Sequence, residues 1–78
     1  MPRYYFDIHD GTRESRDEEG SEFSDLQAAC DEAVAVLPAI AGNGAFPQAD
    51  REIVATVRGA DGRALFRTRL SVKSERLD

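Results

Sequence analysis

Hydrophobic and polar residues alternate along residues 3–9. One face carries Tyr4, Phe6 and Ile8, and the other carries Tyr5, Asp7 and His9. A period of two with aromatic residues predicts a half-buried strand. Asp10-Gly11 then predicts a turn, because glycine accepts positive φ and aspartate can bond its own backbone. The polar residues 14–22 predict a second, exposed strand, with Gly20 at a bulge or at the strand's end.

The next segment predicts a helix that begins at Ser24. The sequence "SDLQ" matches a capping box, in which the Ser24 hydroxyl accepts from the Gln27 amide and the Gln27 side chain reaches back. Asp25 in the first turn suits the helix dipole. Helical spacing then aligns an apolar stripe, which consists of Leu26, Ala29, Cys30, Ala33, Leu37 and Ile40.

Pro38 interrupts the helical pattern. It removes an interior hydrogen bond, so it either bends the helix or ends it near Leu37. Gly42-Asn43-Gly44 stops the helix in either case. The residues from 41 to 50 predict a loop, in which Phe46 packs back as an anchor.

The second half of the chain predicts a hairpin. If Asp61-Gly62 are the central residues of a type I′ turn, the numbers of paired residues sum to 123. One face then pairs Val57 with Phe66, Ala55 with Thr68 and Ile53 with Leu70. The other face pairs Arg58 with Leu65, Thr56 with Arg67 and Val54 with Arg69. A slip of one residue would mix these sets, so the turn and the alternation favour one register.

Together these elements predict an α+β fold of order ββαββ, with one helix packed on a four-stranded, mainly antiparallel sheet. Residues 1–78 form a single small domain. Such a short chain buries only about 60–65% of its unfolded surface, so we expect a thin core. The pattern leaves the strand order open. The predicted core is Tyr4, Phe6, Ile8, Leu26, Ala29, Cys30, Ala33, Leu37, Ile53, Val57, Phe66, Leu70 and Val72.

The composition indicates where in the cell the protein is expected to lie. The chain is 41% hydrophobic and 32% charged, which is typical of soluble globular proteins. It contains no apolar run of the roughly 20 residues that cross a bilayer, and it starts without an apolar signal region. We therefore expect a cytoplasmic protein without membrane contact. The single cysteine excludes an internal disulfide, and we expect Cys30 to be a buried, unreactive thiol.

The net charge of −5 is unevenly distributed. Residues 1–37 carry ten acidic and three basic side chains, whereas residues 38–78 carry five acidic and seven basic ones. The acidic excess argues against a general nucleic-acid binder, whose domain is usually basic. The asymmetry is compatible with a local basic face or with complementary self-association.

Four segments of the chain resemble a known family. They are the opening "MPRYYFDIHDG", then "DEEGSEFSDLQAACDEA", "REIVATVRGADGRALFRTRLSV" and the final "ERLD". The chain resembles, over nearly its whole length, a family of short, uncharacterised alphaproteobacterial proteins known as a domain of unknown function. The resemblance implies a small stand-alone protein of the bacterial cytoplasm. It implies no activity, cofactor or catalytic residue.

Asp7, His9 and Asp10 are the candidates for chemistry. Asp7 and His9 share a strand face about 6.5–7 Å apart, so they can share a divalent ion or act as an acid–base pair. The chain has one histidine, however, and spacing fixes no third ligand. The favoured interpretation is that Asp7 and His9 are solvated strand residues and Asp10 is turn chemistry. We expect no cofactor.

Two charged groups complete the candidates. The acidic run Asp17-Glu18-Glu19 lacks the ligand pattern of a calcium loop, and a solvated edge strand is the favoured interpretation. Basic side chains gather on one face of the hairpin, namely Arg58, Arg67, Arg69 and Lys73. They suit phosphates or an acidic protein surface, but that face lacks the aromatic residues of RNA-binding sheets, apart from Tyr5. The carboxylate of Asp7, or the acidic half of another copy of the chain, can neutralise these positive charges.

The sequence therefore favours a non-enzymatic protein-interaction or self-associating module over an enzyme. A sheet with one helix leaves its second face open to a partner. The predicted interaction face consists of Tyr5, Val54, Arg58, Leu65, Arg67, Arg69 and Lys73. The alternative is a regulatory protein that contacts nucleic acid through the basic residues of the last two strands.

Overall fold

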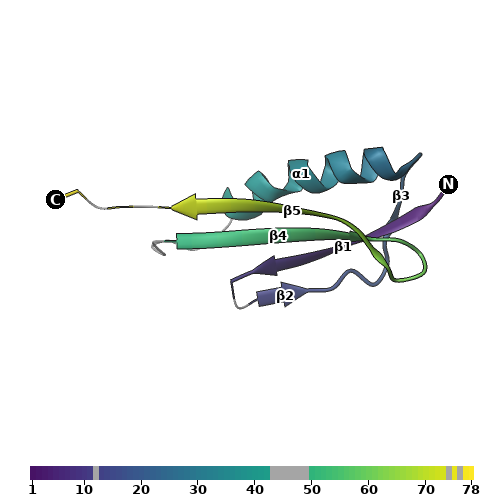
Figure 1. Ribbon diagram of the computed structural model, residues 1–78, viewed down its shortest axis with the longest axis horizontal. Coiled ribbons are helices and arrows are strands. Elements are labelled where there is room, and N and C mark those ends of the chain that lie inside the picture. Colours follow the sequence, from purple (N-terminus) through teal and green to yellow (C-terminus); the bar gives the residue numbers. More distant parts are fainter. Residues whose placement is uncertain (12, 43–49, 74, 76) are drawn as a thin grey trace.

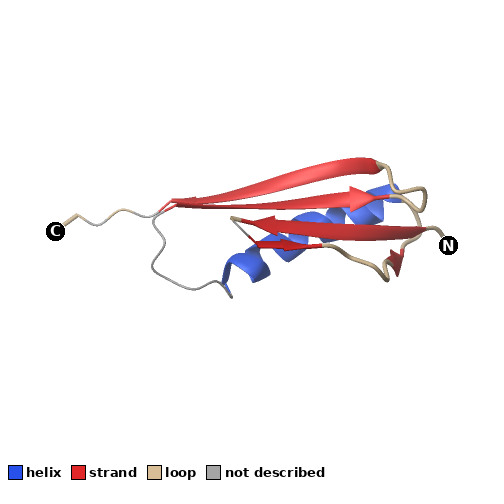
Figure 2. Ribbon diagram, turned by 90° about the horizontal axis from the view of Figure 1, so that it is seen from below, coloured by secondary structure: helices blue, strands red, loops and turns tan. Residues whose placement is uncertain are grey.

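The fold is one helix laid on one face of an antiparallel sheet (Figures 1 and 2). The computed structural model describes residues 1–11, 13–42, 50–73, 75 and 77–78. The elements are β1 (Arg3–Asp10), β2 (Arg13–Ser15), β3 (Ser21–Glu22), α1 (Leu26–Gly42), β4 (Asp50–Arg58) and β5 (Ala64–Lys73). The predicted α+β class is confirmed. The predicted loop anchor, Phe46, lies outside the described residues.

The strand order is β2-β1-β4-β5, and β3 also pairs with β1. The two hairpins therefore meet through β1 and β4, with Phe6 opposite Val57 and Ile8 opposite Ala55. Helix α1 packs mainly over β4 and β5. We call the covered side of the sheet the inner face and the other side the outer face. No helix in the described part of the chain has the length and hydropathy needed to cross a membrane.

The predicted second strand is divided in two. Ile8 lies opposite Ser15 in β2, and Tyr4 lies opposite Ser21 in β3. Three residues of β1, 5–7, thus lie opposite five residues, 16–20. The two additional residues break the regular pairing, which is why a continuous strand over residues 14–22 was a wrong prediction.

The N-cap of the helix lies one residue later than predicted. The Asp25 carboxylate accepts from the Ala28 amide at 2.9 Å, so Asp25 is the N-cap in place of Ser24. The Gln27 side chain donates to Asp31 at 2.9 Å and does not close a capping box. Asp25 suits the start of a helix, because its carboxylate satisfies a free main-chain amide and interacts favourably with the helix dipole.

Pro38 lies inside the helix, which continues to Gly42. Of the two predicted effects of Pro38, an end near Leu37 is therefore excluded, and the helix ends at Gly42 as predicted. Pro38 removes the hydrogen bond to the carbonyl of Val34, one turn earlier on the same side of the helix. Both residues are exposed, so water can bond the released carbonyl.

The β4–β5 hairpin has the predicted register but a different turn. Partner numbers sum to 123 from Val57–Phe66 to Asp50–Lys73. The Gly62 amide donates to the Gly59 carbonyl at 3.0 Å, and the Gly59 amide donates to Arg63 at 2.9 Å. Gly62 alone in the loop has positive φ, +89°, so this is a three-residue loop and not a type I′ turn. Arg58 then pairs with Ala64, and a bulge at Leu65 restores the register, which corrects the predicted Arg58–Leu65 pair.

The core agrees with the predicted inner faces except at its ends. Among the described residues, the buried hydrophobic side chains are Ala29, Ala33, Leu37, Ile53, Ala55 and Val57. Leu26 and Val72 are 37% and 36% exposed, so placing them in the core was wrong. Both lie near the end of an element, where the opposite layer no longer covers them. Phe23 was not predicted, yet its ring lies 5.6 Å from that of Phe6, centroid to centroid, and closes the end of the core near β3.

Cys30 is only half-buried, beside the core and not within it. Burial, followed by the charge of Asp31, raises the pKa of the Cys30 thiol. A raised pKa disfavours the reactive thiolate, as the expected unreactive thiol requires.

Two glycines at positive φ make a matched test of the packing. An added Cβ at Gly62 meets nothing within 4 Å, whereas at Gly20 it lies 2.8 Å from Tyr5 Cε2 and 2.9 Å from the Tyr4 carbonyl. We expect Gly62→Ala to lower the free energy of unfolding by about 1 kcal/mol through backbone strain. Gly20→Ala adds steric overlap, for a total of roughly 3 kcal/mol. Urea unfolding measures both values, and equal losses would contradict the close approach of β1 to Gly20.

Candidate interaction surface

On the outer face of the sheet, Arg58 is held by an ion pair with Asp7 and by the ring of Tyr5. Arg58 of β4 donates from Nε to Asp7 Oδ2 at 2.6 Å and from Nη2 to Asp7 Oδ1 at 3.2 Å. Its guanidinium also lies 5.1 Å from the centre of the Tyr5 ring. The Arg58 and Asp7 side chains are only 12% and 22% exposed. Asp7 thus neutralises the charge of Arg58, which is one of the four basic residues predicted to share this face.

Asp17 fills the gap between β2 and β3. Its Oδ2 accepts from the Phe6 amide at 3.1 Å, and its Oδ1 accepts from the amides of Glu19 and Gly20 at 3.1 and 3.0 Å. Its own amide donates to Asp7 at 3.0 Å, and its carbonyl accepts from Arg58 at 2.8 Å. The carboxylate therefore replaces strand pairing where the register of the edge is broken. We call Asp7, Asp17 and Arg58 the outer-face network.

The network favours ionised carboxylates. Partial burial alone raises the pKa of Asp7, but hydrogen bonds from Arg58 and from the Asp17 amide outweigh it and hold that pKa below its usual value. Burial also raises the pKa of Asp17, and its bonds from the Gly20, Phe6 and Glu19 amides outweigh this effect. Both groups are therefore charged at neutral pH.

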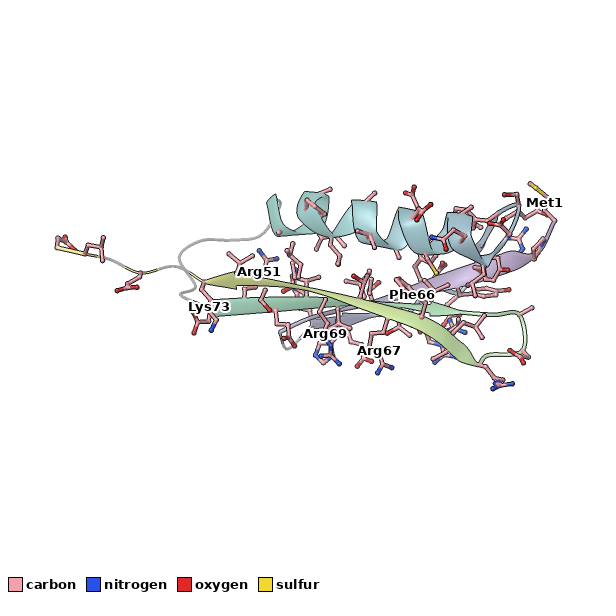
Figure 3. The ribbon with its side chains drawn as sticks, turned by 45° about the horizontal axis from the view of Figure 1, so that its top comes forward. Met1, Arg51, Phe66, Arg67, Arg69 and Lys73 are labelled. Atoms are coloured by element: carbon pink, nitrogen blue, oxygen red, sulfur yellow. The ribbon has the colours of Figure 1, made fainter. Side chains whose placement is uncertain are left out.

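A second ion pair lies on the inner face. Arg51 of β4 donates from Nε and Nη2 to the two Asp10 oxygens at 3.0 and 2.5 Å, and from Nη1 to the Ala41 carbonyl at 3.1 Å. Figure 3 shows Arg51 between the sheet and the helix. The hydrogen bond from Arg51, more than its charge, lowers the pKa of Asp10. Arg51 thus joins β1, through Asp10, to the end of α1. In the part of the chain that the structure describes, the Asp10 carboxylate bonds Arg51 and not the turn backbone, which corrects its assignment to turn chemistry.

The three candidates for chemistry have separate surroundings. Asp7 and Asp10 belong to opposite faces, and each is bound to its own arginine. His9 is exposed, and its Nε2–H donates to the Gly11 carbonyl at 2.6 Å. Within the described residues, no three His, Cys, Asp or Glu side chains are grouped closely enough to hold a metal. The arrangement offers salt bridging and not a shared ligand set.

The remaining predicted cations form a row along β5. Arg67, Arg69 and Lys73 are exposed, and Figure 3 shows Arg67 and Arg69 projecting from the face opposite the helix. We call these three residues the basic row. Arg67 donates from Nε to the Thr56 hydroxyl at 3.2 Å, and Arg69 Nη1 lies 3.4 Å from Glu52 Oε1. The Arg69 and Glu52 side chains are more than half exposed, so this pair is open to competition.

A shallow hollow of about 420 Å³ lies beside the basic row on the outer face. Its lining includes Val54 and Thr56 at the centre, with His9 and Glu14 on one side and Arg67 and Arg69 on the other. Tyr5 and Leu65 do not line it. Tyr5 lies against Arg58, and Leu65 lies at the hairpin bulge beside Gly59. The three uncharged residues of the predicted interaction face, Tyr5, Val54 and Leu65, thus lie in separate places.

Sequence reasoning missed the structural role of Asp17, although a signal was present. The stretch Asp17-Glu18-Glu19-Gly20 has aspartate at the first and glycine at the fourth position, which is the signature of a type I turn. Glu18 and Glu19 remain exposed, as the solvated interpretation predicted, but Asp17 is half-buried. The role of Arg51 carried no local signal, because its partners lie on β1 and α1.

Replacement of Asp7 tests the outer-face network through the pH dependence of the free energy of unfolding. Asp7 has a lower pKa in the folded chain than in the unfolded one, so its stabilisation is complete above about pH 4 and is lost as the pH falls further. We expect Asp7→Asn to lower the free energy of unfolding at pH 7. The difference from the parent chain should shrink in acid, because only the parent has this stabilisation to lose. Urea unfolding between pH 7 and pH 2.5 measures it.

Glu52→Gln is the matched control, because it removes the exposed pair with Arg69 on the same face. We expect a loss of about 0.5 kcal/mol or less at pH 7, as is typical of exposed ion pairs. The loss for Asp7→Asn should be several times larger. Similar losses for the two variants would contradict a bound Arg58.

Comparison with known proteins supplies the family. The family model described as Domain of unknown function (DUF6894) matches residues 3–71. No curated protein and no solved structure matches the chain. The matched region extends from the first residue of β1 almost to the end of β5, and so includes both ion pairs and most of the basic row. The chain therefore belongs to the DUF6894 family of unknown function.

Proposed function

We propose that this chain is a non-enzymatic protein-interaction module whose outer face binds an acidic partner. The basic row carries the proposal. Its three cations are exposed, and among the described residues their one ion-pair partner is the exposed Glu52. Of the four basic residues predicted to share this face, Arg58 is already bound to Asp7, so the three that remain for a partner lie along β5. Complementary charge of this kind gives specificity and speeds association.

The two ion pairs also support binding over catalysis. Asp7 and Asp10 have lowered pKa values because arginines bond them, although burial opposes this at Asp7. A general base works best with a pKa near the working pH, and these carboxylates are moved away from it. Their arginine partners also occupy the oxygens that would otherwise face a substrate. Both pairs act as cross-links between β1 and β4.

The surroundings of the basic row favour an acidic protein segment over nucleic acid. The chain carries a net charge of −5, and exposed Glu14 and Glu18 lie toward the opposite edge of the sheet. A long polyanion would meet these acids, whereas a short segment can stay beside β5. Single-stranded nucleic acids also use aromatic side chains for stacking. Tyr5, the aromatic residue of this face, is half-buried against the Arg58 guanidinium.

The test compares two anionic probes of similar charge. Fluorescence anisotropy measures the binding of a labelled ten-residue glutamate peptide and of a ten-nucleotide single-stranded DNA at equal ionic strength. We expect the peptide to bind more tightly. Arg67→Gln/Arg69→Gln should weaken peptide binding at least about tenfold, since two charged contacts of about 1 kcal/mol each are lost.

Arg13→Gln/Arg63→Gln is the matched control. It removes two exposed cations outside the basic row and gives the same net charge. It should leave peptide binding within about twofold of the parent value, because distant exposed charges are screened. An equal loss for both double variants, or tighter binding of the DNA, would contradict the proposal. Sedimentation of the chain alone shows whether the acidic surface of a second copy fills the role of partner.

A further inference from the structure

The two edges of the sheet are unlike each other. On one edge, β1 is covered by β2, by β3 and, between them, by the Asp17 carboxylate bonded to the Phe6 amide. On the other edge lies β5, which pairs with β4 on one side only. Among the residues that the structure describes, no strand pairs with the other side of β5. Figure 2 shows α1 behind the sheet and not along this edge.

The open edge is long and largely regular. β5 spans ten residues, and its bulge lies at Leu65, close to the turn. Residues 66–73 keep one register with β4, so eight residues extend without interruption. Every second residue of an edge strand points its amide and carbonyl outward, ready to pair with another chain. β5 contains no proline to block such pairing.

The side chains of β5 define what an added strand must carry. On the outer face stands the basic row, Arg67, Arg69 and Lys73. On the inner face, Phe66 and Leu70 pack against the core, and Val72 is 36% exposed. Because an added strand has the same period of two, its acidic residues can line one side and its apolar residues the other. A segment with alternating acidic and apolar residues complements both faces.

A second copy of β5 does not meet this requirement. If two β5 strands pair antiparallel about a two-fold axis normal to the sheet, their outer faces remain on the same side of the joined sheet. The basic row of one copy then lies beside that of the other. Like charges on adjacent strands are destabilising. The charge of the edge therefore disfavours self-pairing and favours an acidic occupant.

We propose that β5 binds an extended acidic segment by strand addition, which continues the sheet beyond its open edge. Main-chain hydrogen bonds supply part of the affinity, and the basic row selects acidic residues at alternate positions. This inference rests on the proposed function, because it names the form and position of the acidic partner. It adds a requirement that charge alone does not impose, namely free main-chain amides in the bound segment.

The experiment changes the main chain of the probe and leaves the protein intact. The first probe is a labelled Glu-Val-Glu-Thr-Glu-Val-Glu peptide. The second has the same sequence with N-methyl groups on two successive central residues, one on each edge of the extended peptide. The methyl groups remove main-chain donors and obstruct pairing while the charge is kept. We expect methylation to weaken binding at least about tenfold. The methyl group on the edge that faces β5 removes one main-chain hydrogen bond and also leaves a β5 carbonyl without its donor.

The location of binding is measured by amide exchange in the intact protein. Bound parent peptide should slow hydrogen exchange at alternate residues of β5 and leave exchange in β2 unchanged. Equal affinity for the two peptides, with loss of both in Arg67→Gln/Arg69→Gln, would overturn strand addition while the proposed function stands. Failure of the parent peptide and of the ten-residue glutamate peptide to bind would overturn both.

Discussion

The ion pair between Asp7 and Arg58, with Asp17 beside it, is the interaction on which the rest of the structure depends. It joins three segments that are distant in the sequence: β1, the residues between β2 and β3, and β4. These contacts place the first hairpin beside the second and so fix the centre of the sheet. Asp10 and Arg51 form a similar ion pair on the inner face, at the last residue of β1. A domain of 78 residues has a thin core, so such polar cross-links matter more to it than to a larger domain.

The same network determines which charges remain at the surface. Arg58 and Arg67 both belong to the outer face, yet Arg58 is 12% exposed and bound, whereas Arg67 is exposed and contacts a neutral hydroxyl. The network thus takes up Arg58 and leaves the basic row exposed along β5. On the opposite edge, Asp17 occupies the pairing groups of β1. The result is a sheet with one edge made of two short, separate strands and one long, basic edge along β5.

Much of the fold follows from alternation alone. The inner residues of β1 and the hairpin register that sums to 123 could be predicted because a strand has a fixed period and one slip exposes the core. Side chains that bond the backbone could not be predicted in this way. Alternation does not reveal that the Asp17 and Asp25 carboxylates bond main-chain amides, because it assigns a residue to a face and says nothing of a nearby free amide. The bound state of Arg58 needed the strand order, since its partner is on β1, and spacing within a hairpin does not reveal the neighbouring hairpin.

The central claim is that the outer face divides its arginines into one bound internally and others available to a partner. Hydrogen exchange of the arginine Nε–H groups, resolved by nuclear magnetic resonance, measures this division directly. The Nε–H of Arg58 is bonded to Asp7, so it should exchange much more slowly with solvent than the Nε–H of Arg69, whose side chain is 56% exposed. Exchange at Arg58 as fast as at Arg69 would contradict the claim.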